Sequence, residues 1–397
     1  MAFKKLVLFG AGKIGRSFIG QIFSRAGYDV VFIDVDERVI SELNRLHQYR
    51  VMIKSDEGDS EMLVTHVRGV LAANESEVAG EISTCDIAAT AVGPMALPKV
   101  CALIAKGLEL RHKKIADYPL DIILAENLRE AASLVRAEIS KNMLNDIDLG
   151  NYLGLVETSI GKMVPIMPAN LSEVDPLLVF AEPYNTLILD KKGFKNPLPT
   201  VPDLAPKENM PAWVDRKSFI HNLGHAAAAY YGFSRYPELV YLHEVMVKPD
   251  VYKTTRDTML QSADILMRQY PGEFTSESLT EHIDDLLHRF SNKALGDTVY
   301  RVGQDLYRKL SPEDRLVAPL KLAIKYRMPY DKILNIIACA MGFCAVDEHG
   351  NRSSSDMKFG EETNMGISHI LENVCKLPVD DYPEVHDQAH KKIKALF

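Results

Sequence analysis

Four polar side chains that can exchange protons or donate hydrogen bonds lie within one short segment, DRKSFIHNLGHAAAAYYG (215–232). On a regular helix, Lys217, His221, Asn222 and His225 fall within an arc of about 140°. Oxidation of an alcohol by hydride transfer needs a base for the hydroxyl proton, a donor for the alkoxide-like oxygen and a group that orients the pair. We therefore predict that Lys217, Asn222 and His225 are the catalytic residues.

The lysine can exchange a proton near neutral pH only if its pKa is lowered from the ordinary value of about 10.4. Burial and neighbouring positive charges both have this effect. The small apolar run Ala226–Ala229 that follows would let the helix pack closely against its surroundings. A solvated lysine at the start of a helix is the structural alternative for Lys217.

The two histidines, His221 and His225, have the i, i+4 spacing of a metal-binding pair. No HExxH glutamate accompanies them, and the sequence indicates no third ligand. We predict no metal site, and we retain a zinc-dependent lyase or hydrolase as an alternative that a metal assay would separate.

A glycine-rich motif near the start of the chain indicates the second reactant. Gly10-Ala11-Gly12-Lys13-Ile14-Gly15 follows a short apolar run and opens a segment with helical periodicity, and Asp34 ends the next apolar run. This is the dinucleotide fingerprint, in which backbone amides and a helix N-terminus hold a diphosphate. An aspartate at this point accepts hydrogen bonds from ribose hydroxyls and repels a 2′-phosphate, so we predict NAD. Asp36 is the alternative residue for this role.

A further turn, Thr90-Ala91-Val92-Gly93-Pro94, follows another apolar run. Two roles are open for it: Ala91, Val92 and Gly93 either pass along the middle of the coenzyme or form a plain turn at the end of a strand.

The elements that must position these residues divide the chain in two. Up to about residue 160, apolar runs alternate with helical patterns, which predicts a parallel sheet with helices on both faces. Residues 49–70 indicate a small antiparallel insertion with a turn at Glu57–Gly58–Asp59. A proline-rich stretch (196–211) precedes long helical patterns. We predict a doubly wound, Rossmann-type α/β domain over 1–195 and a mostly α-helical domain over 196–397.

Composition excludes several other functions. The chain of 397 residues is too long for one ordinary core. Its net charge of −8 argues against a nucleic-acid surface, and no apolar run reaches the ~18 residues of a membrane span. The five cysteines show no CxxC spacing. We expect a cytoplasmic monomer or homodimer with a small-molecule substrate and no nucleic-acid or membrane partner.

The motifs together resemble the polyol-specific long-chain dehydrogenases and reductases. Lys217-Ser-Phe-Ile-His-Asn222-Leu-Gly-His225 matches the K-x4-N-x2-H hallmark of that family, and FGAGKIGRSFIG, TAVGP, AENL and RVGQDLYRKLSPEDRLVAPL match it in the same order. The resemblance implies a metal-independent, NAD(P)-linked enzyme in which Lys217 is the general acid/base, Asn222 helps to hold the reacting oxygen and His225 positions the substrate. The AENL motif adds Asn127 to the cofactor-binding residues.

The same resemblance indicates residues that bind the substrate. Glu157 matches an acidic residue of the branch that acts on mannitol 1-phosphate, and Arg301 and Lys309 match a basic pair that reaches the substrate. A phosphate group needs cationic partners, and Arg308 and Lys162 are further candidates.

The sequence also departs from that branch. Gln304 stands where the branch has arginine, and Gly161-Lys162 replaces Asp-Arg. The tail after Gly342 has no counterpart in the family's pattern.

We predict from these residues an NAD-dependent oxidoreductase that interconverts a sugar-alcohol phosphate and a ketose phosphate, with mannitol 1-phosphate and fructose 6-phosphate as the first pair. The alternative is a reductase of unphosphorylated polyols or hexuronates, of the mannitol, fructuronate or tagaturonate type. An alternative from another class is a nonenzymatic NAD-sensing protein, which would not need Lys217, Asn222 and His225 on one helical face.

Overall fold

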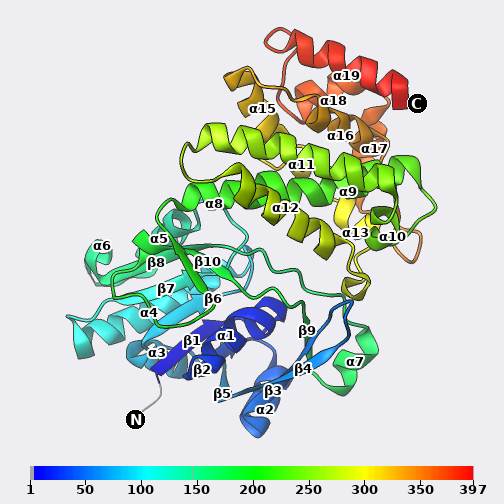
Figure 1. Cartoon of the computed structure of the whole chain (residues 1–397). Helices are drawn as coiled ribbons and strands as arrows, with labels where there is room; N and C mark the ends of the chain where they lie inside the picture. Colours follow the sequence, from blue (N-terminus) through cyan, green and yellow to red (C-terminus); the bar gives the residue numbers. More distant parts are fainter. Residues whose placement is uncertain (1–3, 146, 397) are drawn as a thin grey trace. The chain divides into compact units, whose positions relative to one another are not determined.

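The computed structural model describes residues 4–145 and 147–396. The chain forms two compact units, unit 1 up to Val214 and unit 2 from Asp215 (Figure 1). This division falls later than the boundary at residue 195 suggested by the sequence. The reason is that β11 (Leu204–Lys207) pairs with β10 (Leu187–Asp190) and thus extends the sheet of unit 1.

Unit 1 is built on an eight-stranded sheet in the order β11-β10-β8-β7-β6-β1-β2-β5. All neighbouring strands pair in parallel except β10 and β8. From β1 the chain builds one side of the sheet and then returns to β6, so the strand order reverses beside β1. The remaining strands of this sheet are β1 (Lys4–Phe9), β2 (Tyr28–Asp34), β5 (Val67–Leu71), β6 (Ile87–Thr90), β7 (Leu120–Leu124) and β8 (Leu153–Ser159).

The expected antiparallel insertion is present as a hairpin. It consists of β3 (Gln48–Ile53) and β4 (Ser60–Thr65), and β9 (Val179–Ala181) completes a three-stranded sheet. Gly58 has a φ of +123° in the turn, a conformation that L side chains rarely adopt. The end of the predicted insertion belongs instead to β5 of the main sheet.

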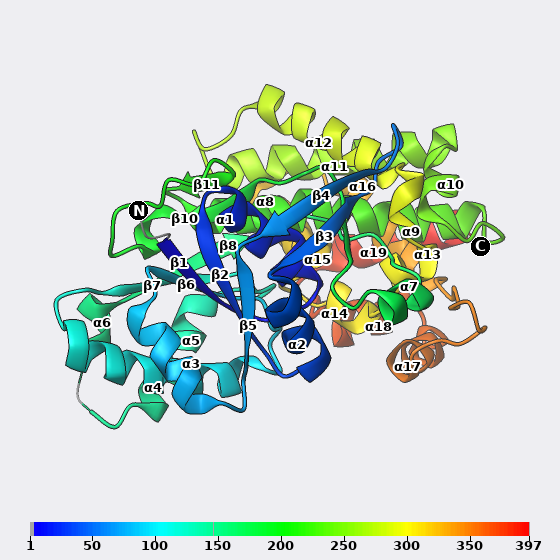
Figure 2. The same cartoon turned by 90° about the horizontal axis from the view of Figure 1, so that it is seen from below.

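Helices cover both faces of the main sheet because its strands are apolar on both sides. In β1, Leu6 and Leu8 join one buried cluster, whereas Val7 and Phe9 join the other. Figure 2 shows α3, α4 and α5 on one face. The helices of unit 1 are η1 (Gly15–Gly20), α1 (Gln21–Arg25), α2 (Glu37–Leu46), α3 (Glu75–Thr84), α4 (Leu97–Ile115), α5 (Ala131–Asn142), α6 (Leu149–Tyr152), α7 (Ala169–Val174) and η2 (Lys191–Gly193).

Unit 2 is helical and is organised around α9 (Leu223–Arg235), which continues from α8 (Met210–Arg216) through η3 (Lys217–Asn222). The residues from Ala226 to Tyr230 have no exposed surface. A Cβ at Gly224 would lie 2.5 Å from the Met259 sulfur, so this glycine allows close packing on α11. The other helices are α10 (Leu242–Met246), α11 (Pro249–Gln269), α12 (Ser276–Phe290), η4 (Lys293–Leu295), α13 (Val299–Gly303), α14 (Leu306–Lys309), α15 (Val317–Tyr326), α16 (Asp331–Met341), α17 (Ser354–Thr363), α18 (Ile367–Asn373) and α19 (Pro383–Leu396).

Across the described ranges, none of these helices has the length and apolarity that a membrane crossing requires.

Candidate active site

The glycine motif forms a turn that requires glycine at two of its positions, Gly10 and Gly15. Gly10 has a φ of +99°, and a Cβ there would lie 2.4 Å from the Ala91 carbonyl oxygen. A Cβ at Gly15 would lie 1.9 Å from the Gly10 carbonyl oxygen. A Cβ at Gly12, by contrast, would meet no described atom within 4 Å. Lys13 and Ile14 begin the helix that follows. The turn thus exposes backbone in front of a helix N-terminus, which suits a diphosphate.

The structure separates the roles of the two candidate aspartates, Asp34 at the end of β2 and Asp36 just beyond it. Asp34 accepts hydrogen bonds from the Ala11 amide through Oδ2 at 2.6 Å and from the Val35 amide through Oδ1 at 2.7 Å. Asp36 caps α2 by accepting from the amides of Arg38 at 3.0 Å and Val39 at 3.1 Å. Only Asp34 of this pair lines the adjoining cavity.

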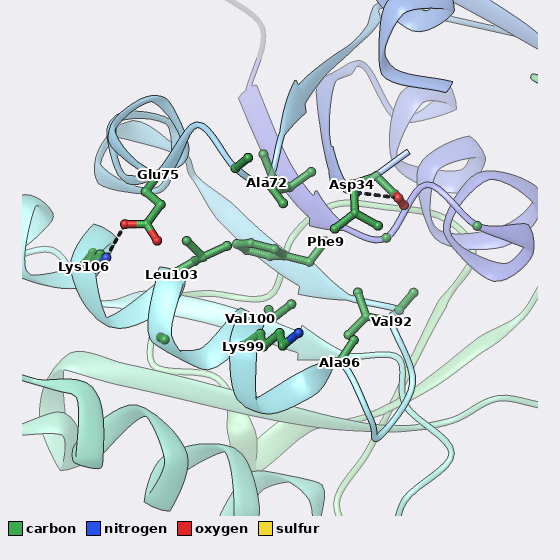
Figure 3. Close-up of a pocket in the computed structure, with 17 residues that line it drawn as sticks. Phe9, Asp34, Ala72, Glu75, Val92, Ala96, Lys99, Val100, Leu103 and Lys106 are labelled. Carbon is green, nitrogen blue, oxygen red and sulfur yellow. Dashed lines mark hydrogen bonds and ion pairs between the residues drawn. The ribbon is translucent and has the colours of Figure 1, made fainter. Parts of the chain in front are cut away.

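This cavity has a volume of about 640 Å³ and lies along the carboxyl ends of β1, β2 and β6. Figure 3 shows Asp34 at one end and the Glu75–Lys106 ion pair at the other, with apolar side chains such as Val100 and Leu103 between them. An apolar slot beside a carboxylate fits an adenosine, whose base packs on apolar groups and whose ribose hydroxyls donate to Asp34.

The Thr90–Pro94 turn is fixed by Glu126, which the sequence analysis did not single out. This buried carboxylate accepts from the Val92 amide at 3.0 Å and the Gly93 amide at 2.8 Å. Ala91 and Val92 line the cavity, and Asn127 directly follows Glu126. The sequence signal that could have indicated Glu126 is its position just after the apolar run of β7.

In unit 2 the helix that carries the predicted catalytic residues widens into a π turn, η3. A π-helix pairs residues i and i+5, so Lys217 and Asn222 are neighbours one turn apart. Burial, helped by the positive charges of Arg315 and Arg308 and opposed by the Asp314 carboxylate, lowers the Lys217 pKa to about 8. The structure thus provides the lowered lysine pKa that proton exchange near neutrality requires.

The His225 ring stacks on Phe290, with centroids 4.4 Å apart and planes at 12°. Its Nε2 lies 3.7 Å from the Asp297 carboxylate. Burial lowers the His225 pKa to about 3, with help from the charge of Arg301. His225 is therefore a neutral imidazole at physiological pH.

The second histidine, His221, lies in the core beside His225, with ring centroids 5.8 Å apart. Burial sets its pKa well below the ordinary value. Within the described part of the chain, no group of three or more histidine, cysteine, aspartate or glutamate side chains could hold a metal ion.

The basic segment after α12 does not form one helix, since Gln304 and Asp305 separate α13 from α14. Arg301 pairs with Asp297, the carboxylate that also faces His225. Lys309 is buried and donates to the carbonyl oxygens of Val302 and Gln304. Burial, together with Arg315, lowers the Lys309 pKa to about 7.

A second group of charges surrounds Asp314. Arg315 donates through Nε to Asp314 at 2.7 Å, and Arg308 approaches the same carboxylate at 3.3 Å while also pairing with Asp305. The two Nη groups of Arg315 have no hydrogen-bond acceptor among the residues that the structure describes. The sequence analysis did not single out Arg315, because it lies beyond α14, outside the helical spacing that linked Arg301 to Lys309.

Two predicted substrate residues belong to networks inside unit 1. Glu157 accepts from the Ala132 amide at 2.9 Å, near the start of α5. Lys162 is buried and donates to the Tyr184 carbonyl at 2.8 Å and the Asn185 side chain at 2.9 Å.

The arrangement described so far defines a two-domain dehydrogenase, with a Rossmann domain and a helical domain that carries a buried lysine of lowered pKa. Residues 4–203 match the family model of the mannitol dehydrogenase Rossmann domain, and residues 209–393 match that of the mannitol dehydrogenase C-terminal domain. The chain belongs to the mannitol dehydrogenase family. The predicted fold class and the predicted polyol dehydrogenase family are thereby confirmed.

Solved structures share this fold. One is D-sorbitol dehydrogenase in substrate-free form, with 16% identity and a TM-score of 0.77 over 98% of this chain and 91% of that chain. Another is mannitol 2-dehydrogenase of Pseudomonas fluorescens in a ternary complex with NAD and D-mannitol, with 15% identity and a TM-score of 0.73 over 99% of this chain and 92% of that chain.

Proposed function

We propose that this protein is an NAD-dependent dehydrogenase that interconverts mannitol 1-phosphate and fructose 6-phosphate, the reaction of a mannitol-1-phosphate 5-dehydrogenase. The cofactor follows from Asp34 and the glycine turn, and the Rossmann-domain match and the NAD-bound neighbour support it. The observation that carries the choice of substrate is the group of cations around Lys217 and His225 in unit 2, which consists of Arg301, Arg308, Lys309 and Arg315.

Bound NAD supplies the hydride acceptor for alcohol oxidation. Lys217 handles the proton: its free amine takes the proton from the hydroxyl during oxidation, and its ammonium returns a proton to the carbonyl oxygen during reduction. Asn222, one π turn away, donates its side-chain amide to the same oxygen. His225, held against Phe290, orients a neighbouring substrate hydroxyl.

The phosphate is assigned to the arginines rather than to the lysines. A phosphoryl group presents nearly two negative charges near neutral pH and favours bidentate guanidinium contacts. Arg315 has Nη groups available for such a contact, and Arg301 and Arg308 are about half exposed. Lys309 and Lys162 already donate to carbonyl oxygens.

A second candidate is a dehydrogenase of unphosphorylated polyols or hexuronates. Arg301, Arg308 and Arg315 each have a carboxylate partner in unit 2, which offsets their charge. Gln304 also supplies no charge where the phosphate branch has arginine. The two structural neighbours are named for sorbitol and mannitol, neither of which carries a phosphate.

Steady-state kinetics with NADH would test the two candidates on D-fructose 6-phosphate, D-fructose and D-fructuronate. We expect kcat/KM for fructose 6-phosphate to exceed that for fructose at least about a hundredfold, since losing the phosphate contacts costs ~3 kcal/mol. Equal values for the two ketoses would contradict the phosphate assignment. NADH binding without turnover of any of the three compounds would instead support the third alternative, a nonenzymatic NAD-sensing protein.

Variants would locate the phosphate site. Arg315→Gln and Arg301→Ala should each lower kcat/KM for fructose 6-phosphate by about tenfold or more and change that for fructose little. Arg256→Ala is the matched control, because Arg256 also pairs with a carboxylate in unit 2, Asp284, but lies on α11 outside the cation group.

A further inference from the structure

The expectation that the tail after Gly342 has no counterpart in the family is wrong, because the match to the C-terminal family model extends to residue 393. This tail places a carboxylate beside the basic segment. Asp356, on α17, is only 2% exposed. Its Oδ2 accepts from the Asp305 amide at 2.9 Å, and its Oδ1 accepts from the Leu306 amide at 2.9 Å. These two amides belong to the turn that joins α13 to α14.

This turn requires support because Asp305 has a φ of +70° and a ψ of 52°. A residue with a side chain is uncommon in this left-handed region, where Cβ approaches the following carbonyl oxygen. A buried carboxylate that accepts from two successive amides stabilises the turn directly. Asp356 thus compensates for the backbone conformation of Asp305.

Neighbouring side chains hold the preceding residues in place. The Tyr230 hydroxyl, on α9, donates to the Gly303 carbonyl at 2.8 Å. The Phe343 ring packs so closely on Gly303 that a Cβ would lie 2.1 Å from it. Arg352 joins the tail to this group by donating to the carbonyl oxygens of Phe343 at 3.2 Å and Asp356 at 3.0 Å.

We propose that Asp356 is a positioning residue that sets the orientation of Arg301 and Arg308 toward one group of the substrate. Arg301 precedes the turn and Arg308 follows it, so the conformation of Asp305 fixes the direction of α14 relative to α13. Asp356 itself does not touch the substrate. The inference deepens the proposed function and rests on it for the role of these arginines.

The test compares Asp356→Asn with Asp347→Asn, the matched control. Asp347 lies in the same tail and also accepts from backbone amides, those of His349 and Asn351. Among the residues that the structure describes, no hydrogen bond joins Asp347 to the turn at Asp305. We expect Asp356→Asn to raise KM for D-fructose 6-phosphate about tenfold while kcat, KM for NADH and Tm change little. The control should keep every wild-type value. An unchanged KM in an Asp356→Asn protein that keeps the wild-type Tm would overturn the proposal.

A double-mutant cycle keeps the test decisive if Asp356→Asn is unstable. Glycine adopts positive φ without support, so Asp356→Asn should raise KM much less in an Asp305→Gly background than in the wild type. The pairing of Arg308 with Asp305 is lost in both members of that comparison. Equal effects in the two backgrounds would overturn the proposal.

Both experiments are repeated with D-fructose. If wild type prefers the free sugar, the proposed phosphate substrate fails, and KM for D-fructose then reports on Asp356 in the same way. The two failures therefore remain distinguishable.

Discussion

The proposed cofactor site of unit 1 and the proposed catalytic site of unit 2 differ in the groups that form them. The first consists largely of backbone, shaped by positions such as Gly10 and Gly15 where a Cβ has no room. The second consists of side chains such as Lys217, whose pKa depends on charges that lie about a hundred residues away in the chain, including Arg315. A site made of backbone can be read from adjacent residues, whereas a site made of interacting charges exists only once the chain has folded.

The largest expected effect comes from the catalytic site. Lys217→Ala should lower kcat by about 10²- to 10⁴-fold, because it removes the proposed general acid/base, and should leave NADH affinity nearly unchanged. Single-turnover rates and NADH fluorescence titration measure the two quantities. Lys253→Ala, an exposed lysine of α11, should retain full activity. A Lys217→Ala variant with more than about a tenth of wild-type activity would remove the lysine from the mechanism.

Two glycines should separate backbone shape from cofactor contact. Gly15→Ala forces a Cβ against a backbone carbonyl, so it should lower the free energy of unfolding by about 1–3 kcal/mol and weaken NADH binding. Gly12→Ala has room in the protein but intrudes on the diphosphate, so Kd for NADH should rise about tenfold or more at unchanged Tm. Denaturant melts and titration calorimetry measure both. Equal losses of Tm in the two variants would contradict this distinction.

The two aspartates at the end of β2, Asp34 and Asp36, should likewise separate an effect on the cofactor from an effect on stability. Asp34→Ser removes the carboxylate that repels a 2′-phosphate, so the preference for NAD over NADP should narrow about tenfold or more. Asp36→Ala removes the cap of α2 and should cost about 1 kcal/mol of stability without changing that preference. Cofactor preference is measured as the ratio of kcat/KM values. An unchanged ratio of kcat/KM for NAD to that for NADP in Asp34→Ser would show that another residue selects the cofactor.

The smallest effect concerns the charge that tunes the lysine. In the proposed mechanism, ketose reduction requires protonated Lys217, so kcat/KM for the ketose should be constant below a pH of about 8 and fall above it. The kcat/KM for polyol oxidation should rise through the same pH. Arg315→Gln removes a positive charge, which raises the Lys217 pKa, and both limbs should move upward by about half a pH unit or more. Arg256→Gln should leave the profile in place. A downward shift in Arg315→Gln would contradict the electrostatic argument.

The difference between the two sites also explains which features could be predicted from the sequence. Alternating apolar runs predicted the sheet of unit 1, and the glycine spacing located its turn, because both features depend on near neighbours. Lys162 was assigned to the phosphate by its charge, although its ammonium donates to Tyr184 and Asn185 within unit 1. No spacing rule could indicate Asp297 beside His225, or Asp356 beneath the turn at Asp305, since these contacts join segments that only the tertiary fold brings together.

The π turn at Lys217–Asn222 can be regarded as one residue inserted into an otherwise regular helix. If the same residues formed an uninterrupted α-helix, Lys217 and Asn222 would lie about 140° apart around the helix axis. The extra residue of the π turn brings these two side chains onto one face of the helix. The chain's length at this point, and not only its residue types, is therefore part of the proposed catalytic site.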